Sequence, residues 1–255
     1  MRERVVSGVL DRPRSSDFVN PRATPIVIAI DGPAASGKSS TAQWVASVLG
    51  YRHVDSGALY RAATAAAARS GVPATQWTED LVLEAAKRVS LSPRDTSFAP
   101  CIDSASVEAE IRGAEVTQFV SQVAQMPRVR TWVNALVRET ASEHNVVVDG
   151  RDMGTAVFPD ATLKVFLIAD PWERARRRLT QQHGRRPTDA EIAEETDRIV
   201  HRDAQDATQT VQAKDAVLID TTYLTQPEQV ERIVALARAV TQRGSETSPV
   251  DEPRS

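Results

Sequence analysis

Short runs of apolar, often β-branched residues alternate along the chain with longer stretches in which apolar positions recur every three or four residues. Four runs have the length of strands, Ile26–Ile30, Val146–Val148, Leu163–Ile168 and Ala216–Ile219, and a weaker one covers Tyr51–Val54. Runs that are hydrophobic at every position suit strands covered on both faces. Strands separated by helical patterns are typical of an α/β fold with a mainly parallel sheet, which is the fold class we predict.

The spacing of these runs also predicts the domain organisation. The interval from about 81 to 142 is too long for a simple crossover, so we expect an inserted substructure there. Both ends of the chain are rich in Arg, Ser, Asp and Pro, a composition that buries little apolar surface. We therefore expect disordered ends at 1–24 and 243–255 around a single domain, 25–242, whose core comprises 25–80 and 143–242.

Composition narrows the class of protein. The 255 residues are 41% hydrophobic and 25% charged, which fits a globular domain and disfavours a disordered chain or a coiled coil. A formal charge of -3 disfavours a protein that coats a nucleic acid polymer. Cys101 is the only cysteine, so a cysteine-rich metal site is excluded. No apolar run spans a membrane and the N-terminus lacks the apolar centre of a secretory signal, so we expect a cytoplasmic protein that binds no membrane.

The strongest motif is GPAASGKS at Gly32–Ser39, which matches the phosphate-loop pattern G-x-x-x-x-G-K-[ST] at every fixed position. Its backbone N–H groups surround a polyphosphate, Lys38 reaches the β- and γ-phosphates, and the Ser39 hydroxyl ligates Mg²⁺. A strand precedes the motif and a helical pattern, Ser39–Leu49, follows it until Gly50. This context disfavours a merely structural glycine turn.

A phosphate loop alone does not separate a kinase from a GTPase or a motor. A switch GTPase needs an N-K-x-D motif, and no asparagine of this chain precedes a lysine. Nothing in the sequence favours a motor ATPase. We therefore predict a small phosphotransferase whose other motifs bind the acceptor.

Two polar clusters follow predicted strands. In DSGALYR, Ser56 is expected to cap the helix that begins near Gly57, and Arg61 lies one turn into that helix, where it could reach an acceptor phosphate. A cap alone is the alternative reading of Ser56. In VVVDGRDMGTAVFPDA, the charged residues Asp149, Arg151 and Asp152 stand at the carboxyl end of a strand, where open α/β sheets bind ligands. A solvated turn is the alternative there.

Together these segments resemble bacterial cytidylate kinase, the (d)CMP kinase of the nucleoside monophosphate kinase group. The resemblance is carried by IAIDGPAASGKSSTA, DSGALYR, EIRGAEV with SQVAQMPRVR, VVVDGRDMGTAVFPDA with LKVFL, and HRDAQD, spread from Ile28 to about Asp220. It implies a phosphate-loop kinase fold with a five-stranded, mainly parallel sheet flanked by helices, a monophosphate-binding insert at about 81–142 and a short lid. It also implies direct in-line transfer of a phosphoryl group from Mg²⁺-ATP to CMP or dCMP by a monomer.

The resemblance assigns roles to individual residues. For ATP it implies Gly32, Pro33, Ala34, Ala35, Ser36, Gly37, Lys38, Ser39 and Ser40, and for Mg²⁺ it implies Ser39 with Asp149 as a further candidate. For CMP it implies Ser56, Arg130 and Asp152 at the cytosine, Arg61 and Arg151 at the phosphate, and Ser121, Arg202 and Asp206 near the sugar. A carboxylate that accepts from the cytosine amine discriminates against uracil, because a buried acceptor left without its donor is costly.

One position departs from the family pattern. Many members carry an arginine three residues after the aspartate that matches Asp206, whereas this chain has Gln209 and a shorter segment from Ala207 to Lys214. The choice between ribose and deoxyribose is therefore left open by the sequence.

An arginine-rich segment at about 172–190 is the expected lid. Phosphoryl transfer requires neutralisation of the γ-phosphate oxygens, so some of the segment's arginines are expected to cover the transferring group. By family position, the resemblance implies Arg174 and Arg177, which are expected to act in catalysis with Lys38 and Arg151. Two readings remain beside (d)CMP kinase: a phosphate-loop kinase with another monophosphate or metabolite as acceptor, and a nucleotide-binding regulator without catalysis.

Overall fold

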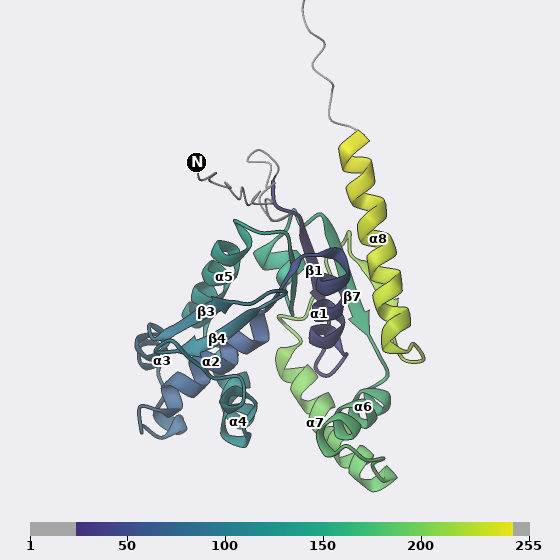
Figure 1. The fold of residues 1–255 in the computed structure, drawn as a ribbon. Helices are drawn as coiled ribbons and strands as arrows, with labels where there is room; N and C mark the ends of the chain where they lie inside the picture. The colour runs from purple at the N-terminus through teal and green to yellow at the C-terminus, as the bar shows by residue number, and fades with distance from the viewer. Residues whose placement is uncertain (1–23, 247–255) are drawn as a thin grey trace, which may run out of the picture.

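A central five-stranded parallel sheet organises the computed structural model, which describes residues 24–246 (Figure 1). The strand order is β2-β6-β1-β7-β8, and every pair of neighbours is parallel. The strands are β1 Val27–Asp31, β2 Arg52–Asp55, β6 Val146–Gly150, β7 Leu163–Ile168 and β8 Val217–Asp220. The predicted α/β fold with five strands is confirmed, and each strand begins and ends within two residues of its expected position.

The sheet is covered on both faces by apolar helices. On one face α1 (Lys38–Leu49) and α8 (Gln226–Glu246) pack on side chains such as Ile28 and Leu167. On the other face α2 (Ser56–Ala68) packs through its alanine-rich surface. The expectation that every strand is covered is wrong for β8, where Leu218 is 50% exposed. β8 is an edge strand, and its apolar sequence alone did not reveal that position.

The predicted insert is a compact unit beside α2. It contains α3 (Glu79–Ala86), a 3₁₀ turn at Glu110–Arg112, α4 (Ala114–Ala124) and α5 (Pro127–Ala141). It also contains a three-stranded antiparallel sheet of β3 Val89–Pro93, β4 Phe98–Ile102 and β5 Ala105–Ser106. Figure 1 shows these elements on the side of the central sheet opposite α8. The sequence predicted an insert at this place but not its sheet.

Two antiparallel helices form a hairpin below the carboxyl ends of the strands in Figure 1. These are α6 (Pro171–His183) and α7 (Asp189–Asp206), and we call them the lid hairpin. Gly184 ends α6 with a positive φ of 64°, and Thr188 with Glu191 forms a capping box at the start of α7. The hairpin has its own small apolar core, which includes Ala175, Leu179 and Ile199.

Both expected boundaries of the domain, residues 25 and 242, lie within the described part of the chain. Helix α8 continues to Glu246, past the boundary expected at residue 242. The remaining expectations for the two ends concern residues 1–23 and 247–255, which lie outside the described part of the chain. Within the described part, no helix combines the length and the apolar character needed to cross a membrane.

The phosphate loop begins at Gly32, where the chain passes very close to the neighbouring strand β7. Gly32 follows β1 with a φ of 149°, and a Cβ atom on it would lie 2.1 Å from the carbonyl oxygen of Leu167 in β7. Only glycine fits this contact without moving a strand. Gly37 also has a positive φ, 85°, and precedes the first residue of α1. The two glycines therefore turn the chain between β1 and α1.

Replacement of Gly32 tests this close approach. We expect Gly32→Ala to lower the free energy of unfolding of the nucleotide-free protein by about 2–4 kcal/mol, since backbone strain adds to a steric clash. The matched control is Gly50→Ala, where φ is 69° but no atom lies within 4 Å of the added Cβ, and we expect a loss of only about 1 kcal/mol. Urea unfolding of both variants measures the difference. Equal losses contradict the proposed contact with β7.

Candidate active site

The phosphate loop holds the amine of Lys38 over its own backbone. Lys38 Nζ donates to the carbonyl oxygen of Pro33 at 2.6 Å and to Ser36 Oγ at 3.3 Å. Burial and the nearby Arg151 guanidinium lower the pKa of Lys38 to about 7. The folded protein therefore holds this amine without a carboxylate in direct contact, an arrangement that an anionic ligand would complete.

Asp149 links the loop to β2. The Ser39 hydroxyl donates to Asp149 Oδ2 at 2.6 Å, and the ring of His53 contacts Asp149 Oδ1 at 2.7 Å. Burial opposes the charged forms of both groups, but their mutual contact raises the pKa of His53 and lowers that of Asp149. The contact between His53 and Asp149 was not predicted from the sequence.

Ser39 and Asp149 are suitable ligands for Mg²⁺ beside a bound polyphosphate. Mg²⁺ prefers oxygen ligands and commonly binds one or two carboxylates together with substrate phosphates. Among the described residues, no group of three or more His, Cys, Asp or Glu side chains forms a metal site by itself. A metal ion here needs oxygen atoms from the substrate, which fits the sequence expectation of Mg²⁺ bound with a nucleotide.

A polar cavity of about 210 Å³ lies next to the phosphate loop, between the ends of β2 and β6, the insert and the lid hairpin. Ala34, Ala35 and Ser39 contribute to its wall. Five arginines also line it, and we call it the arginine cleft: Arg61, Arg112, Arg151, Arg178 and Arg202. Its position at the carboxyl ends of parallel strands agrees with the location predicted for the acceptor motifs.

The charges in the arginine cleft are only partly compensated. Arg202 Nε lies 3.8 Å from Asp206 Oδ2 and, within the described chain, has no hydrogen-bond partner although it is buried. Arg151 Nε donates to the same carboxylate oxygen at 3.3 Å. Burial and the repulsion of Arg151 lower the pKa of Arg202 to about 10. One carboxylate thus serves two guanidinium groups, which leaves the cleft suited to an anion.

A second recognition site lies next to the arginine cleft, at the residue that follows Arg151. Arg130 donates to Asp152 Oδ2 and, at 3.1 Å, to the carbonyl oxygen of Ala124. The Arg130 guanidinium also lies 5.7 Å from the centre of the Tyr60 ring. The Tyr60 hydroxyl is buried and has no partner among the described residues. Arg130 and Asp152, expected to face a base, therefore lie near the ring of a tyrosine that was not predicted from the sequence.

Asp31 holds the backbone around Asp152 in place. Its two carboxylate oxygens accept from the N–H groups of Met153 at 2.9 Å and Gly154 at 2.7 Å. Asp31 is the last residue of β1, so it connects the strand before the phosphate loop to the turn that follows β6. Burial, opposed by these two hydrogen bonds, raises the pKa of Asp31 from 3.8 to about 6.

The helix cap predicted at Ser56 is wrong. α2 begins at Ser56 itself, and its cap is Asp55, whose carboxylate accepts from the N–H of Ala58 at 3.0 Å. The Ser56 hydroxyl instead donates to the carbonyl oxygen of Asp149 at 2.7 Å. This bond holds the end of β6 against the start of α2. Both residues are good caps, and local sequence did not distinguish them.

Arg61 lies in the arginine cleft as expected from its place in α2. Its Nη1 donates to the carbonyl oxygen of Ile111 and to Thr117 Oγ1, both at 3.1 Å. These bonds connect it to the insert. Ser121 is different: in the described part of the chain, no hydrogen bond joins it to the other expected acceptor residues, and its role stays a prediction.

The lid arginines divide by helical face. Arg174 is buried and donates to the carbonyl oxygens of Ala34 and Ala169, while Arg177 donates to the carbonyl oxygens of Thr221 and Thr222. Neither lines the arginine cleft, whereas Arg178, which the sequence reasoning did not select, does. The catalytic roles expected for Arg174 and Arg177 stay predictions. Which arginine faces the cleft depends on how α6 packs against α7.

The chemistry of the two neighbouring sites is complementary. The loop with Lys38 suits a polyphosphate, and the arginine cleft suits a second phosphate group at the same edge of the sheet. The Arg130–Asp152 pair adds donors and acceptors for a planar polar group. Two anions brought together by cationic side chains favour transfer of a phosphoryl group between them.

Comparison with known proteins agrees with this geometry. The model of the family described as cytidylate kinase matches residues 28–239. The cytidylate kinase of Limosilactobacillus fermentum is 42% identical over 218 residues, which cover 82% of this chain and 93% of that protein. The cytidylate kinase of Streptomyces avermitilis is 41% identical over 219 residues, 83% of this chain and 92% of that protein. The cytidylate kinase of Desulfitobacterium hafniense is 42% identical over 212 residues, with coverages of 82% and 91%.

The raised pKa of Asp31 predicts a pH dependence of stability. Between about pH 4 and pH 6 the folded protein holds a proton on Asp31 that the unfolded chain has released, so stability from this group falls as the pH rises through that window. Asp31→Asn resembles the protonated carboxyl and lacks this dependence. From pH 4 to pH 7 we expect the free energy of unfolding of the variant, relative to wild type, to rise by up to about 3 kcal/mol.

Urea unfolding at several pH values measures this difference. Asp160→Asn, at an exposed position, is the matched control and should follow the wild-type profile. A profile of Asp31→Asn parallel to that of the wild type contradicts the assignment.

Proposed function

The chain belongs to the cytidylate kinase family, and we propose that it transfers the γ-phosphoryl group of ATP to the phosphate of CMP or dCMP, forming ADP and CDP or dCDP. The observation that carries this proposal is the juxtaposition of the phosphate loop and the arginine cleft, with Ala34, Ala35 and Ser39 in the wall between them. Donor and acceptor phosphates held in these two places would meet at the same edge of the sheet.

The donor triphosphate binds to the loop from Gly32 to Ser40, with the Lys38 amine at the β- and γ-phosphates. The burial of Lys38 without a carboxylate in direct contact supports this role, because bound phosphates supply a closer counter-charge than Asp149 and Asp31 do. Ser39 and Asp149 hold Mg²⁺ together with these phosphates. Bound Mg²⁺ neutralises charge that develops on the phosphate oxygens.

The acceptor binds with its phosphate in the arginine cleft and its base toward Arg130 and Asp152. Arg61 and Arg151 hold the phosphate, and the buried Ser56 at the start of α2 also lines the cleft. Asp152, which is also paired with Arg130, accepts from the exocyclic amine of cytosine. Uracil has a carbonyl oxygen in place of this amine, so the carboxylate then faces an acceptor where it requires a donor. The sugar lies next to Arg202 and Asp206. Both Arg202 and Arg151 contact the carboxylate of Asp206.

Transfer requires no covalent intermediate on the protein. An oxygen of the CMP phosphate carries negative charge at neutral pH and attacks the γ-phosphorus in line with the leaving ADP oxygen. The protein positions the two reactants and neutralises the charge between them, which is the main source of catalysis in phosphoryl transfer. Arg178 of the lid hairpin lies in the cleft wall beside Arg151 and Arg202, so we assign it a part in this neutralisation. The insert, 79–141, forms part of the binding site for the acceptor nucleotide. The lid hairpin closes over both nucleotides.

A panel of acceptors tests the proposed function. With ATP and Mg²⁺, CMP and dCMP should be phosphorylated with kcat/KM at least about a hundredfold above that for UMP, AMP, GMP and dTMP, since a buried acceptor that loses the donor from the base is costly. A coupled assay of ADP formation measures the rates. Turnover of UMP or AMP as fast as that of CMP contradicts the assigned base site, and absence of CDP formation contradicts the function.

Removal of the Lys38 amine separates catalysis from folding. Lys38→Ala should lower kcat/KM at least about a hundredfold, since the amine stabilises the charge of the transferring group. The melting temperature of the nucleotide-free protein should change by no more than a few degrees, because the lost charge is buried without a carboxylate in contact. The exposed Lys87 provides the control variant Lys87→Ala. A large fall in melting temperature without ligand would show that Lys38 mainly stabilises the fold.

A further inference from the structure

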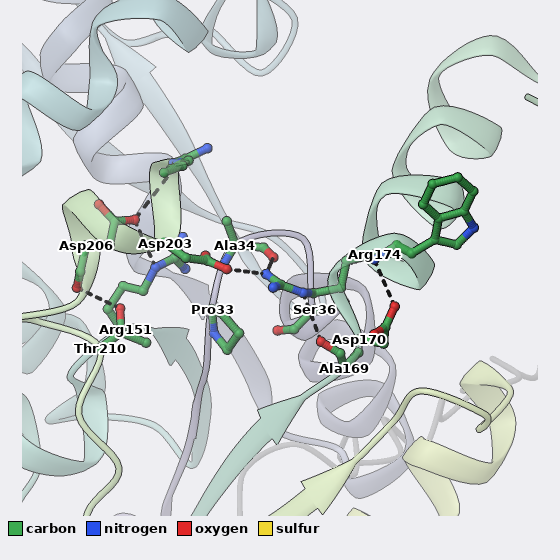
Figure 2. A network of polar contacts seen from close by, with 12 residues as sticks. Pro33, Ala34, Ser36, Arg151, Ala169, Asp170, Arg174, Asp203, Asp206 and Thr210 are labelled. Atoms are coloured by element: carbon green, nitrogen blue, oxygen red, sulfur yellow. Dashed lines mark hydrogen bonds and ion pairs between the residues drawn. The ribbon is translucent and has the colours of Figure 1, made fainter. Parts of the chain in front are cut away.

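Both backbone polar groups of one phosphate-loop residue, Ala34, are bound by the lid hairpin. The N–H of Ala34 donates to Asp203 Oδ1 at 3.0 Å, and its carbonyl oxygen accepts from Arg174 Nη1 at 2.7 Å. Arg174 comes from α6 and Asp203 from α7, so two helices meet at this single residue. Figure 2 shows the two side chains meeting beside Ala34. We call these three residues the Ala34 clamp.

The clamp is closed by a charged contact. Arg174 Nη1 also donates to Asp203 Oδ2 at 2.6 Å, and Arg174 Nε donates to the carbonyl oxygen of Ala169, just after β7. The Arg174 side chain is 4% exposed and Asp203 23% exposed. Each charge is therefore paired and hydrogen-bonded where water has little access, which makes these bonds stronger and more directional than exposed ones.

The next residue of the loop, Ala35, has a strained backbone conformation that the clamp helps to hold. Ala35 has a φ of 55°, a left-handed conformation that costs a non-glycine residue free energy. Its side chain packs against the apolar core of the lid hairpin. Such a conformation persists only where surrounding contacts hold it, and the bonds to Ala34 are the polar part of those contacts. The N–H groups that receive phosphate follow directly in the chain.

The same helix reaches the arginine cleft. Asp206 lies one turn after Asp203 on α7, and its carboxylate accepts from Arg151 at 3.3 Å. Figure 2 shows both contacts of α7 in one view. One turn of α7, from Asp203 to Asp206, thus contacts both the phosphate loop and a side chain that lines the arginine cleft.

We propose that Asp203, acting through Arg174 and Ala34, is a positioning residue that holds the phosphate loop in its ATP-binding conformation and in register with the arginine cleft. Asp203 does not touch a substrate in this role. Arg174 is accordingly assigned to the loop and not to the transferring phosphoryl group, because its Nε and Nη1 atoms are bound to the protein. The proposal rests on the proposed function only through ATP binding at the loop, so it does not depend on which monophosphate is the acceptor.

Direct binding of ATP tests the proposal without catalysis. Asp203→Asn keeps an oxygen for Ala34 but removes the counter-charge of Arg174. Calorimetry with ATP and Mg²⁺ should show a Kd raised at least about tenfold, since a charge-assisted contact is lost. The matched control is Asp197→Asn, an identical change at an exposed position of the same helix, which should leave Kd within about twofold of wild type. An unchanged Kd for Asp203→Asn overturns the proposal.

Binding of the acceptor CMP should be affected much less than binding of ATP. The KM for CMP should stay within about threefold in Asp203→Asn while kcat falls, because the cleft arginines remain but the donor is misplaced. Equal weakening of ATP and CMP binding, accompanied by a lower melting temperature of the apo protein, would assign Asp203 a general structural role and overturn the proposal. Failure of wild-type protein to phosphorylate CMP bears on the proposed function alone.

Hydrogen exchange reports on the loop itself. In Asp203→Ala the Ala34 N–H loses its acceptor, and peptides covering 32–37 should exchange at least about tenfold faster than in Asp197→Asn, whereas peptides of α4 should be unchanged. Where the alanine variant does not fold, Asp203→Asn is measured instead, and a smaller increase in exchange is expected because its amide oxygen still accepts from the Ala34 N–H. Unchanged exchange at 32–37 overturns the proposal.

A double variant tests the pairing. If Arg174 and Asp203 act as one unit, Arg174→Met with Asp203→Asn should weaken ATP binding no more than the more harmful single change. Additive losses in Kd would show that the two residues act separately and would overturn the clamp.

Discussion

Mutual repulsion among cationic side chains is the constraint to which the rest of the site responds. The five arginines of the cleft surround one small volume, and Lys38 lies close enough to be repelled by Arg151 and Arg202. The protein compensates these charges with only a few carboxylates. Asp149 lies in β6, Asp152 comes two residues after the end of β6, and Asp206 is the last residue of α7. The sheet and α7 therefore determine where these negative charges lie. The remaining repulsion is relieved by bound phosphate, and the same side chains therefore create the affinity for both nucleotides.

Much of the fold was predictable because its signals are local. Four of the five core strands coincide with mainly apolar runs, and the phosphate loop has a fixed spacing between a strand and a helix. The antiparallel sheet of the insert was not predicted. β4 contains Pro100 and does not alternate between apolar and polar residues, and the alternation in β3 covers only the four residues from Val89 to Ser92. The exposed face of β8 depends on strand order, which no local pattern records.

Site residues that belong to a sequence motif were predictable. Site residues whose position depends on how helices pack were harder to predict. Ser39, Arg61 and Arg151 lie at the loop and the cleft as their motifs indicated. Arg178 was missed because the arginines of α6 lie on all sides of a helix whose orientation is set by α7. Asp203 was missed for a related reason: its partner, the N–H of Ala34, is 169 positions away in the chain. Such contacts become visible only when distant helices are placed together.

The strand order has a consequence for the order in which the chain folds. β1 lies at the centre of the sheet, yet its neighbour β6 begins at Val146, after the whole insert. Pairings between such distant segments form slowly, because a long loop must close before they gain any contact energy. The insert packs on α2 through contacts closer in sequence and is expected to fold earlier, during synthesis. The loop after β1 reaches its final shape only when β7, α6 and α7 have joined it, so nucleotide binding is among the last properties that the folding chain acquires.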